Sequence, residues 1–194
     1  MSDLRERPRW TVRWPGAAGL VLLFLAGCGA SPHAPALATE DEPYQNEREG
    51  FGFQPPAGWT QIGLSAAPAG PAPQERLLVK YARLSSDKAA ILRVSVVDLP
   101  ESTSLADFLD KRSPGRGWQP VSPSEPLKLD GRPALRRVYA GRQEKEATIR
   151  EIVAVQRDQR VYLFTGTFPQ GDTKAREKVR QAVASLSWKS DADR

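Results

Sequence analysis

Hydrophobic and polar positions alternate with a period of two in several parts of the chain, and this pattern predicts β-strands. Residues 51–59 read as a short strand, a proline–glycine turn and a packed tryptophan. Residues 77–84 and 90–99 each alternate apolar with polar side chains, which indicates two longer strands. In the second run Leu92, Val94 and Val96 share one face, opposite Arg93 and Ser95.

A second group of strands follows in series, separated by turn signals. An aspartate–glycine pair between two apolar runs is a strong hairpin signal, and charged dipeptides mark the later turns. The order predicts an antiparallel meander of about four strands. The expected strands cover residues 127–129, 133–141, 148–156 and 161–168, with turns at 130–131, 143–146 and 158–159.

Two segments show helical spacing instead. Ser104 fits the capping pattern before a short helix that ends near residues 113–115, and its apolar face holds Leu105, Phe108 and Leu109. A proline-rich loop up to Pro126 should follow, pinned by Trp118. The last helix is capped by Asp172 or Thr173 and is closed by Trp188; its apolar positions are Ala175, Val179, Ala182, Val183 and Leu186.

Runs of strands separated by helices predict an α+β fold, in which an antiparallel sheet of about six to seven strands is flanked by helices. A domain spanning residues 44–190 is large enough to bury a core without disulfides. Aromatic residues should form much of that core. The expected core aromatics are Phe51, Phe53, Trp59, Tyr162 and Trp188.

The N-terminal 27 residues have the layout of a secretory signal: a basic stretch, then a short apolar run and small residues. The sequence Leu25-Ala26-Gly27-Cys28 resembles a bacterial lipobox. That resemblance implies a signal peptide over residues 1–27, cleavage before Cys28, and attachment of membrane lipid to the Cys28 sulfur. Two or more acyl chains hold a protein stably at a membrane. An uncleaved N-terminal anchor is the alternative.

Residues 28–43 should form a flexible tether behind the lipidated cysteine, because they are rich in proline, alanine and acid and show no apolar face. His33 lies in this tether, where nothing would fix its position as a general base. Gly29 follows the cysteine, whereas lipoproteins kept in the inner membrane generally carry aspartate there. The resemblance therefore favours attachment to the outer membrane, on either its periplasmic or its outer face.

Composition restricts the chemistry. The chain has one Cys and one His, so it forms no internal disulfide and no Cys/His zinc site. Composition does not exclude a calcium or magnesium site, because these ions take oxygen ligands. We expect no cofactor, because glycine-rich phosphate loops are missing. A net charge of +5 is spread thinly, and we interpret Arg132, Arg136, Arg137 and Arg142 as solvated strand faces rather than a nucleic-acid site.

Catalytic groups are scarce, and we expect no enzyme and no catalytic residue. A nucleophile needs a base beside it, and the domain has no histidine. Two alternatives stay open. A Ser–Lys pair is conceivable among Ser85, Ser86 and Lys88, which read as a polar turn, and any two carboxylates can meet in space. Glu144 and Glu146 alternate with Lys145 at a hairpin tip, which indicates solvation.

Residues 44–188 also resemble a known family. "GFGFQPPAGW", "LDGRPALRRVYAG", "RVYLFTGTFP" and the terminal "ASLSW" are similar to the PsbP/Mog1 type of α/β/α sandwich, which includes small lipoproteins related to DcrB. Members mostly act as binding, assembly or accessory modules, and no functional residue carries over. We therefore expect a lipid-anchored, non-enzymatic envelope module with an envelope protein partner. The alternatives are an envelope enzyme and a passive structural lipoprotein.

Overall fold

A computed structural model of the chain describes residues 42–62, 75–84, 89–112, 114–143 and 145–189. They belong to one compact unit, which spans Leu37–Arg194. The expected signal peptide, Cys28, His33 and the Ser85, Ser86 and Lys88 cluster lie outside the described residues.

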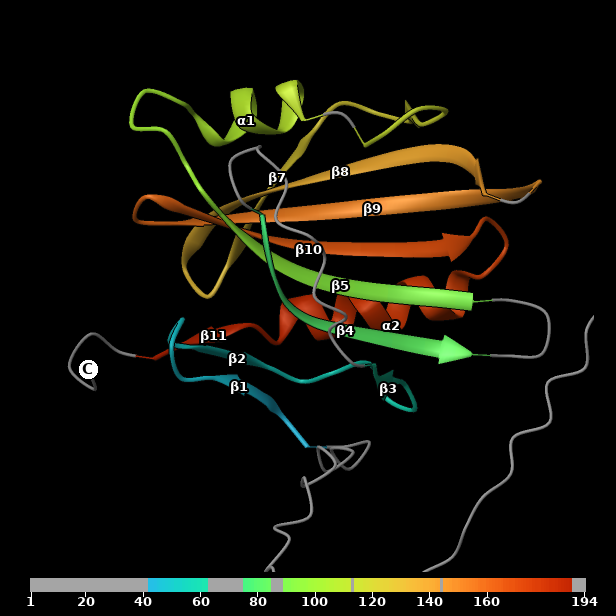
Figure 1. The fold of residues 1–194 in the computed structure, drawn as a ribbon, viewed down its shortest axis with the longest axis horizontal. Helices are drawn as coiled ribbons and strands as arrows, with labels where there is room; N and C mark the ends of the chain where they lie inside the picture. The colour runs from blue at the N-terminus through green and yellow to red at the C-terminus, as the bar shows by residue number, and fades with distance from the viewer. Residues whose placement is uncertain (1–41, 63–74, 85–88, 113, 144, 190–194) are drawn as a thin grey trace, which may run out of the picture. The chain divides into compact units, whose positions relative to one another are not determined.

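The described part contains two helices and eleven strands (Figure 1). The elements are β1 (Tyr44–Asn46), β2 (Phe51–Phe53), β3 (Thr60–Gln61), β4 (Arg76–Leu84), β5 (Ala89–Asp98), α1 (Leu105–Lys111), β6 (Gln119–Pro120), β7 (Glu125–Leu129), β8 (Arg132–Gln143), β9 (Glu146–Arg157), β10 (Arg160–Pro169), α2 (Thr173–Ala184) and β11 (Ser187–Trp188).

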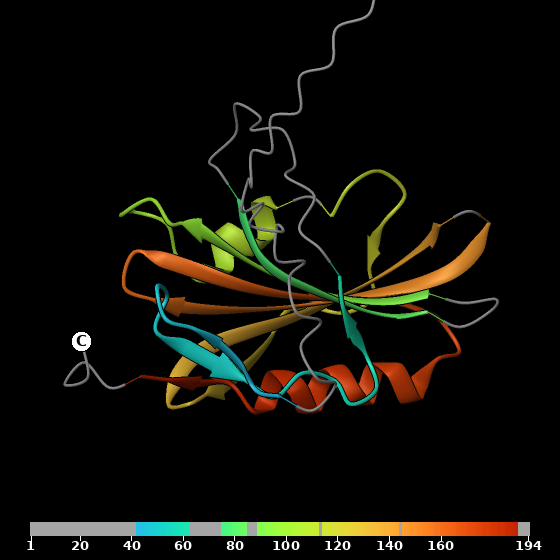
Figure 2. The ribbon, with the colours of Figure 1, turned by 60° about the horizontal axis from the view of Figure 1, so that its bottom comes forward.

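Eight strands form one antiparallel sheet in the order β3-β4-β5-β10-β9-β8-β6, and β7 also pairs with β8. A smaller antiparallel sheet has the order β1-β2-β11. Helix α2 and the small sheet cover one face of the large sheet, and α1 covers part of the other (Figure 2). This arrangement confirms the α+β class.

The strand count of the large sheet is eight rather than six to seven. Four strands that the sequence did not reveal are β1, β3, β6 and β11, each of two or three residues. Such segments are too short to show an alternating pattern. The strand expected at residues 51–53 forms, but in the small sheet. The loop expected before Pro126 also contains β6 and the start of β7.

Two hydrophobic cores lie on opposite faces of the large sheet. The core beneath α2 and the small sheet is rich in aromatic rings, and Phe51, Phe53, Trp59 and Tyr162 are buried there as expected. Trp188 is only partly buried: it lies in β11, where it pairs with Phe51, rather than at the end of the helix. The smaller core under α1 contains Leu105 and Leu109. Burial of both faces fixes the strand register.

Local signals placed the helices and turns correctly. The Ser104 side chain accepts a hydrogen bond from the Asp107 backbone N–H at the start of α1. Asp172 caps α2 by accepting from the Ala175 backbone N–H at 3.0 Å. Asp130 and Gly131 both have positive φ, at 46° and 74°, as the expected hairpin turn requires. Leu186 is buried but follows the helix, which ends at Ala184.

Candidate functional site

Helix α1 leaves part of its sheet face uncovered. Its seven residues span about 10 Å at about 1.5 Å per residue. The ten-residue strands β5 and β10 extend for about 33 Å. The helix therefore covers only one end of these strands, and among the described residues no helix lies over the rest of that face.

The character of the sheet changes where α1 ends. Under the helix, Val97 and Leu163 contribute to the smaller core. Further along the same faces of β5 and β10 come Arg93 and Thr165, which are direct neighbours in the register. On the opposite face β5 is apolar from Ala90 to Val96, and β10 carries Tyr162, Phe164 and Phe168. The polar residues therefore mark a distinct region of the α1 side.

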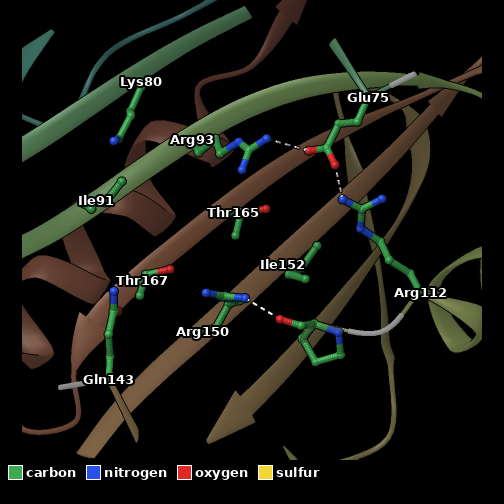
Figure 3. Close-up of a pocket in the computed structure, with 11 residues that line it drawn as sticks. Glu75, Lys80, Ile91, Arg93, Arg112, Gln143, Arg150, Ile152, Thr165 and Thr167 are labelled. Carbon is green, nitrogen blue, oxygen red and sulfur yellow. Dashed lines mark hydrogen bonds and ion pairs between the residues drawn. The ribbon is translucent and has the colours of Figure 1, made fainter. Parts of the chain in front are cut away.

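These residues line a groove of about 270 Å³ (Figure 3). Strands β4, β5, β9 and β10 form its floor, and the segment after α1 contributes Arg112 and Pro114. Four cationic side chains face one carboxylate. The lining residues are Glu75, Lys80, Ile91, Arg93, Arg112, Pro114, Gln143, Arg150, Ile152, Thr165 and Thr167; we call this the cationic groove.

A tryptophan and a glycine position Arg150 in the cationic groove. The Arg150 guanidinium lies 4.1 Å from the centre of the Trp118 ring, and its Nη1 donates a hydrogen bond to the Pro114 carbonyl at 2.6 Å. Trp118 packs against Gly141 of β8, where a Cβ atom would come within 2.7 Å of the ring. Trp118 thus holds both the loop, as expected, and the arginine beside it.

Glu75 organises the other end of the cationic groove. Its carboxylate accepts a hydrogen bond from the Ser95 hydroxyl at 2.5 Å, pairs with Arg93 at 3.4 Å and also contacts Arg112. Burial alone would raise the pKa of Glu75, but the hydrogen bonds from Ser95 and Arg112 and the two arginine charges outweigh it and lower the pKa. Glu75 therefore stays ionised and holds two arginines in place.

Positive charge remains uncompensated after these contacts. Lys80 lies opposite Arg93 in the β4–β5 register, and within the described residues it forms no ion pair. The buried Nε of Arg150 has no hydrogen-bond partner there either. Burial, with a smaller effect of the Arg93 charge, lowers the pKa of Arg150. A bound anion would compensate the charge of Lys80 and reduce its repulsion with Arg93.

The opposite face holds ionic clusters in which each arginine pairs with a carboxylate. Glu49 is buried and accepts hydrogen bonds from Arg76 at 2.7 Å, Tyr162 at 3.0 Å and Arg160 at 3.1 Å. Burial raises the pKa of Glu49, but these partners lower it overall. The cluster joins the β1–β2 turn to β4 and β10, which is a structural role.

A second buried carboxylate, Glu151, lies beside α2. Arg176 and Arg180 donate to it at 2.7 and 2.9 Å. Burial is the largest single influence and raises the pKa of Glu151. The hydrogen bonds and charges of Arg180 and Arg176 together outweigh it and lower the pKa. A cavity of about 230 Å³ next to this cluster is lined mainly by apolar side chains. Here the charges have partners, unlike Lys80 in the cationic groove.

Of the four arginines expected on solvated strand faces, Arg142 is exposed, whereas Arg132, Arg136 and Arg137 are partly buried. Arg136 is paired with Glu125 and Glu151 and its side chain is 24% exposed, whereas Arg137 contacts Asp110 and is 18% exposed. Adjacent residues of a strand point to opposite faces, so these two cations do not form one patch. Glu146 is exposed, as expected for a hairpin tip, and Glu144 lies outside the described residues.

Sequence reasoning missed the cationic groove. Its arginines looked like ordinary solvent-facing residues of separate strands. A signal was present in each strand, because Arg93 and Arg150 interrupt faces that are otherwise apolar near α1. Their convergence depends on strand order, which runs β5-β10-β9 and is not visible in the sequence.

Two further findings concern only the part of the chain that the structure describes. No three His, Cys, Asp or Glu side chains converge there in a way that would hold a metal ion. Neither helix is long and apolar enough to cross a membrane.

Comparison with solved structures identifies the fold. The solution structure of cyanobacterial PsbP (CyanoP) from Synechocystis sp. PCC 6803 matches 80% of this chain and 96% of its own, with a TM-score of 0.55 and 14% identity. The crystal structure of LpqN from Mycobacterium tuberculosis, described as involved in cell envelope biogenesis, matches 77% of this chain and 91% of its own, with a TM-score of 0.52 and 12% identity. The fold is PsbP-like.

A third structure, from Bacteroides thetaiotaomicron, matches 79% of this chain at 11% identity with a TM-score of 0.52, and this chain spans 50% of that protein. No protein-family model matches the sequence, and no curated protein matches it. The PsbP-like fold confirms the coarser part of the resemblance. The likeness to Mog1 and DcrB stays a prediction.

Proposed function

We propose that this protein is a lipid-anchored, non-enzymatic binding module of the cell envelope, and that the cationic groove recognises an anionic partner. The observation that carries the proposal is the uncompensated charge of the groove, where, among the described residues, four cations face the single carboxylate of Glu75. Opposed like charges within a sheet are unfavourable, so their presence at an open face supports a role in binding.

The residue types in the groove suit recognition rather than proton transfer. Arginine side chains donate hydrogen bonds and keep their proton in proteins, so they do not act as general bases. The Glu75 carboxylate is held by Ser95 and Arg112, and its pKa is lowered rather than raised towards neutrality. A general acid working near neutral pH needs the opposite shift. These features support the non-enzymatic part of the proposal.

The envelope location rests on the N-terminal sequence. The lipobox-like residues ending at Cys28 support lipid attachment, and Gly29 favours the outer membrane. The likeness to LpqN, a protein described as involved in cell envelope biogenesis, is consistent with this location. The tether over residues 28–43 would let the domain reach a protein partner in the envelope.

Mass spectrometry of the membrane-extracted protein tests the anchor. We expect a mass equal to residues 28–194 plus acyl chains, and its loss in Cys28→Ala. A full-length, unmodified chain in both samples would overturn lipid anchoring.

Crosslinking in intact cells tests the binding role. We expect one or a few envelope proteins to crosslink to the wild type, and the yield to fall in Lys80→Gln, which removes an unpaired cation from the groove. Lys174→Gln removes one positive charge from α2 on the opposite side of the sheet and serves as the matched control. Equal crosslinking by all three chains would show that the groove is not the recognition surface.

A further inference from the structure

We infer that the ligand of the cationic groove carries a phosphate group, so that the groove is a phosphate-binding site. This inference rests on the proposed function and adds the chemistry of the ligand. It is drawn from the charge balance of the groove, the donors that line it and the space that it encloses.

The charge balance favours an anion with more than one negative charge. Lys80, Arg93, Arg112 and Arg150 line the groove, and Glu75 offsets only one of them. A single carboxylate carries one negative charge, whereas a phosphate monoester carries about −1.5 to −2 near neutral pH. A phosphate group therefore compensates more of the excess than a carboxylate does.

The donors lie in neighbouring rows of the sheet. Lys80, Arg93 and Thr165 are direct neighbours across β4, β5 and β10 in one row. Thr167 and Arg150 pair directly across β10 and β9 in the next row. Two guanidinium groups, an ammonium group and two hydroxyl groups therefore surround the same space, as Figure 3 shows. One guanidinium group donates two parallel hydrogen bonds to two phosphate oxygens, and hydroxyl groups donate hydrogen bonds to the other phosphate oxygens.

Arg150 is already positioned beside the cationic groove. Trp118 fixes the plane of its guanidinium group, and the Pro114 carbonyl accepts from Nη1. An arginine held in place loses little rotamer entropy when it binds, so the cost of ordering the site is small.

The space suits a substituted phosphate. The groove is open to solvent and has a volume of about 270 Å³. A tetrahedral phosphate fills only part of it, so the group attached through the ester oxygen also fits. Phosphatidic acid, a lipid with a phosphate monoester headgroup, and soluble phosphorylated compounds both have this chemistry.

Titration calorimetry tests the inference with the full chain in an uncharged detergent. The probes are inorganic pyrophosphate, succinate as a dicarboxylate, and short-chain phosphatidic acid, whose headgroup is a phosphate monoester. We expect pyrophosphate to bind at least about tenfold more tightly than succinate. Arg93→Gln should weaken pyrophosphate binding about tenfold, the effect of about 1.4 kcal/mol for one lost charged contact. Lys174→Gln should bind as the wild type does.

Glu75→Gln provides a second variant with the opposite expectation. It removes the one negative charge among the described groove residues while keeping the shape of the side chain. The gain in net positive charge should outweigh the lost anchor of Arg93 and Arg112, so pyrophosphate should bind more tightly. Phosphatidic acid that competes with pyrophosphate would identify a lipid headgroup as the source, and binding of pyrophosphate alone would identify a soluble compound.

The outcomes distinguish the phosphate inference from the proposed anionic binding role. If succinate binds as tightly as pyrophosphate and Arg93→Gln weakens both, the phosphate inference is wrong and the anionic binding role stands. If no probe binds, the phosphate inference is overturned, and the crosslinking experiment decides the binding role separately. If Lys174→Gln weakens binding as much as Arg93→Gln, the interaction is general attraction to a basic protein, and the groove is not a phosphate site.

Discussion

Lys80 of β4 and Arg93 of β5 lie directly opposite each other in the large sheet. Arg93 has Glu75 as a partner at 3.4 Å, and Lys80 forms no ion pair within the described part of the chain. Like charges in directly opposed positions destabilise a sheet. The folded protein thus keeps an unfavourable pair at the place where the sheet face is open.

Replacing Lys80 should increase the stability of the protein although it weakens binding in the groove. We predict that Lys80→Gln raises the free energy of unfolding by about 0.2–0.5 kcal/mol, because the repulsion with Arg93 is removed. Urea denaturation of Lys80→Gln and Lys174→Gln in parallel measures this effect. A clear loss of stability in Lys80→Gln would mean that the lysine has a structural partner and that the pair is not strained.

Gly141 should be essential for the position of Trp118. In Gly141→Ala the new Cβ would lie 2.7 Å from the Trp118 ring, so the ring must move and the stack on Arg150 is disturbed. We predict a loss of about 1–3 kcal/mol of stability, together with weaker anion binding. Gly171→Ala is the matched control, because nothing lies within 4 Å of its Cβ position. Equal stability of the two variants, measured by urea denaturation, would contradict this view of Trp118.

Glu49 should be the most sensitive charged residue of the opposite face. Its carboxylate is fully buried, whereas its partners Arg76 and Arg160 are 40% and 47% exposed. Loss of one member of a buried ion pair costs about 3–5 kcal/mol, and the exposed partners place Glu49→Gln near the lower end. Thermal and urea denaturation measure it. Glu47→Gln is the control: it alters a carboxylate that is 76% exposed and should change stability little. Similar losses in both variants would contradict the structural role of Glu49.

Acid should destabilise the protein through three carboxylates. The folded-state pKa values of Glu49, Glu75 and Glu151 are all lowered from the ordinary value of 4.5. The stability that they contribute is therefore fully present above about pH 4.5 and is lost as pH falls through the lowered values. Urea denaturation from pH 7 to pH 3 should show stability declining below about pH 4.5. A stability that stays constant or rises over that range would contradict these ion pairs.

The sequence revealed the parts of the fold that depend on local patterns. Ser104, Asp130 and Asp172 act within a few residues of themselves, so their caps and turns were predictable. The alternation in residues 90–99 predicted β5 for the same reason. Strands of two residues carry no such pattern, and β11 was missed although Trp188 was recognised as a core aromatic.

The candidate site was not predictable to the same extent, because it depends on long-range order. Arg93 and Arg150 belong to strands separated by β10, and only the sheet order brings them to one groove. Glu75 and Lys80 contribute from the β4 region, and Arg112 from the segment after α1. The length of α1, which decides how much of the face is open, follows from the sequence. The identity of the strands beneath the open part does not.

The most direct test of the cationic groove as the recognition surface is a chemical-shift map. We would record backbone and arginine Nε resonances of the full chain in uncharged detergent micelles while adding pyrophosphate. We predict that the chemical-shift changes concentrate on Lys80, Arg93, Arg150 and Thr165 and that the resonances of α2 do not change. Shifts spread evenly over the surface arginines, or concentrated around Glu151 and α2, would contradict it.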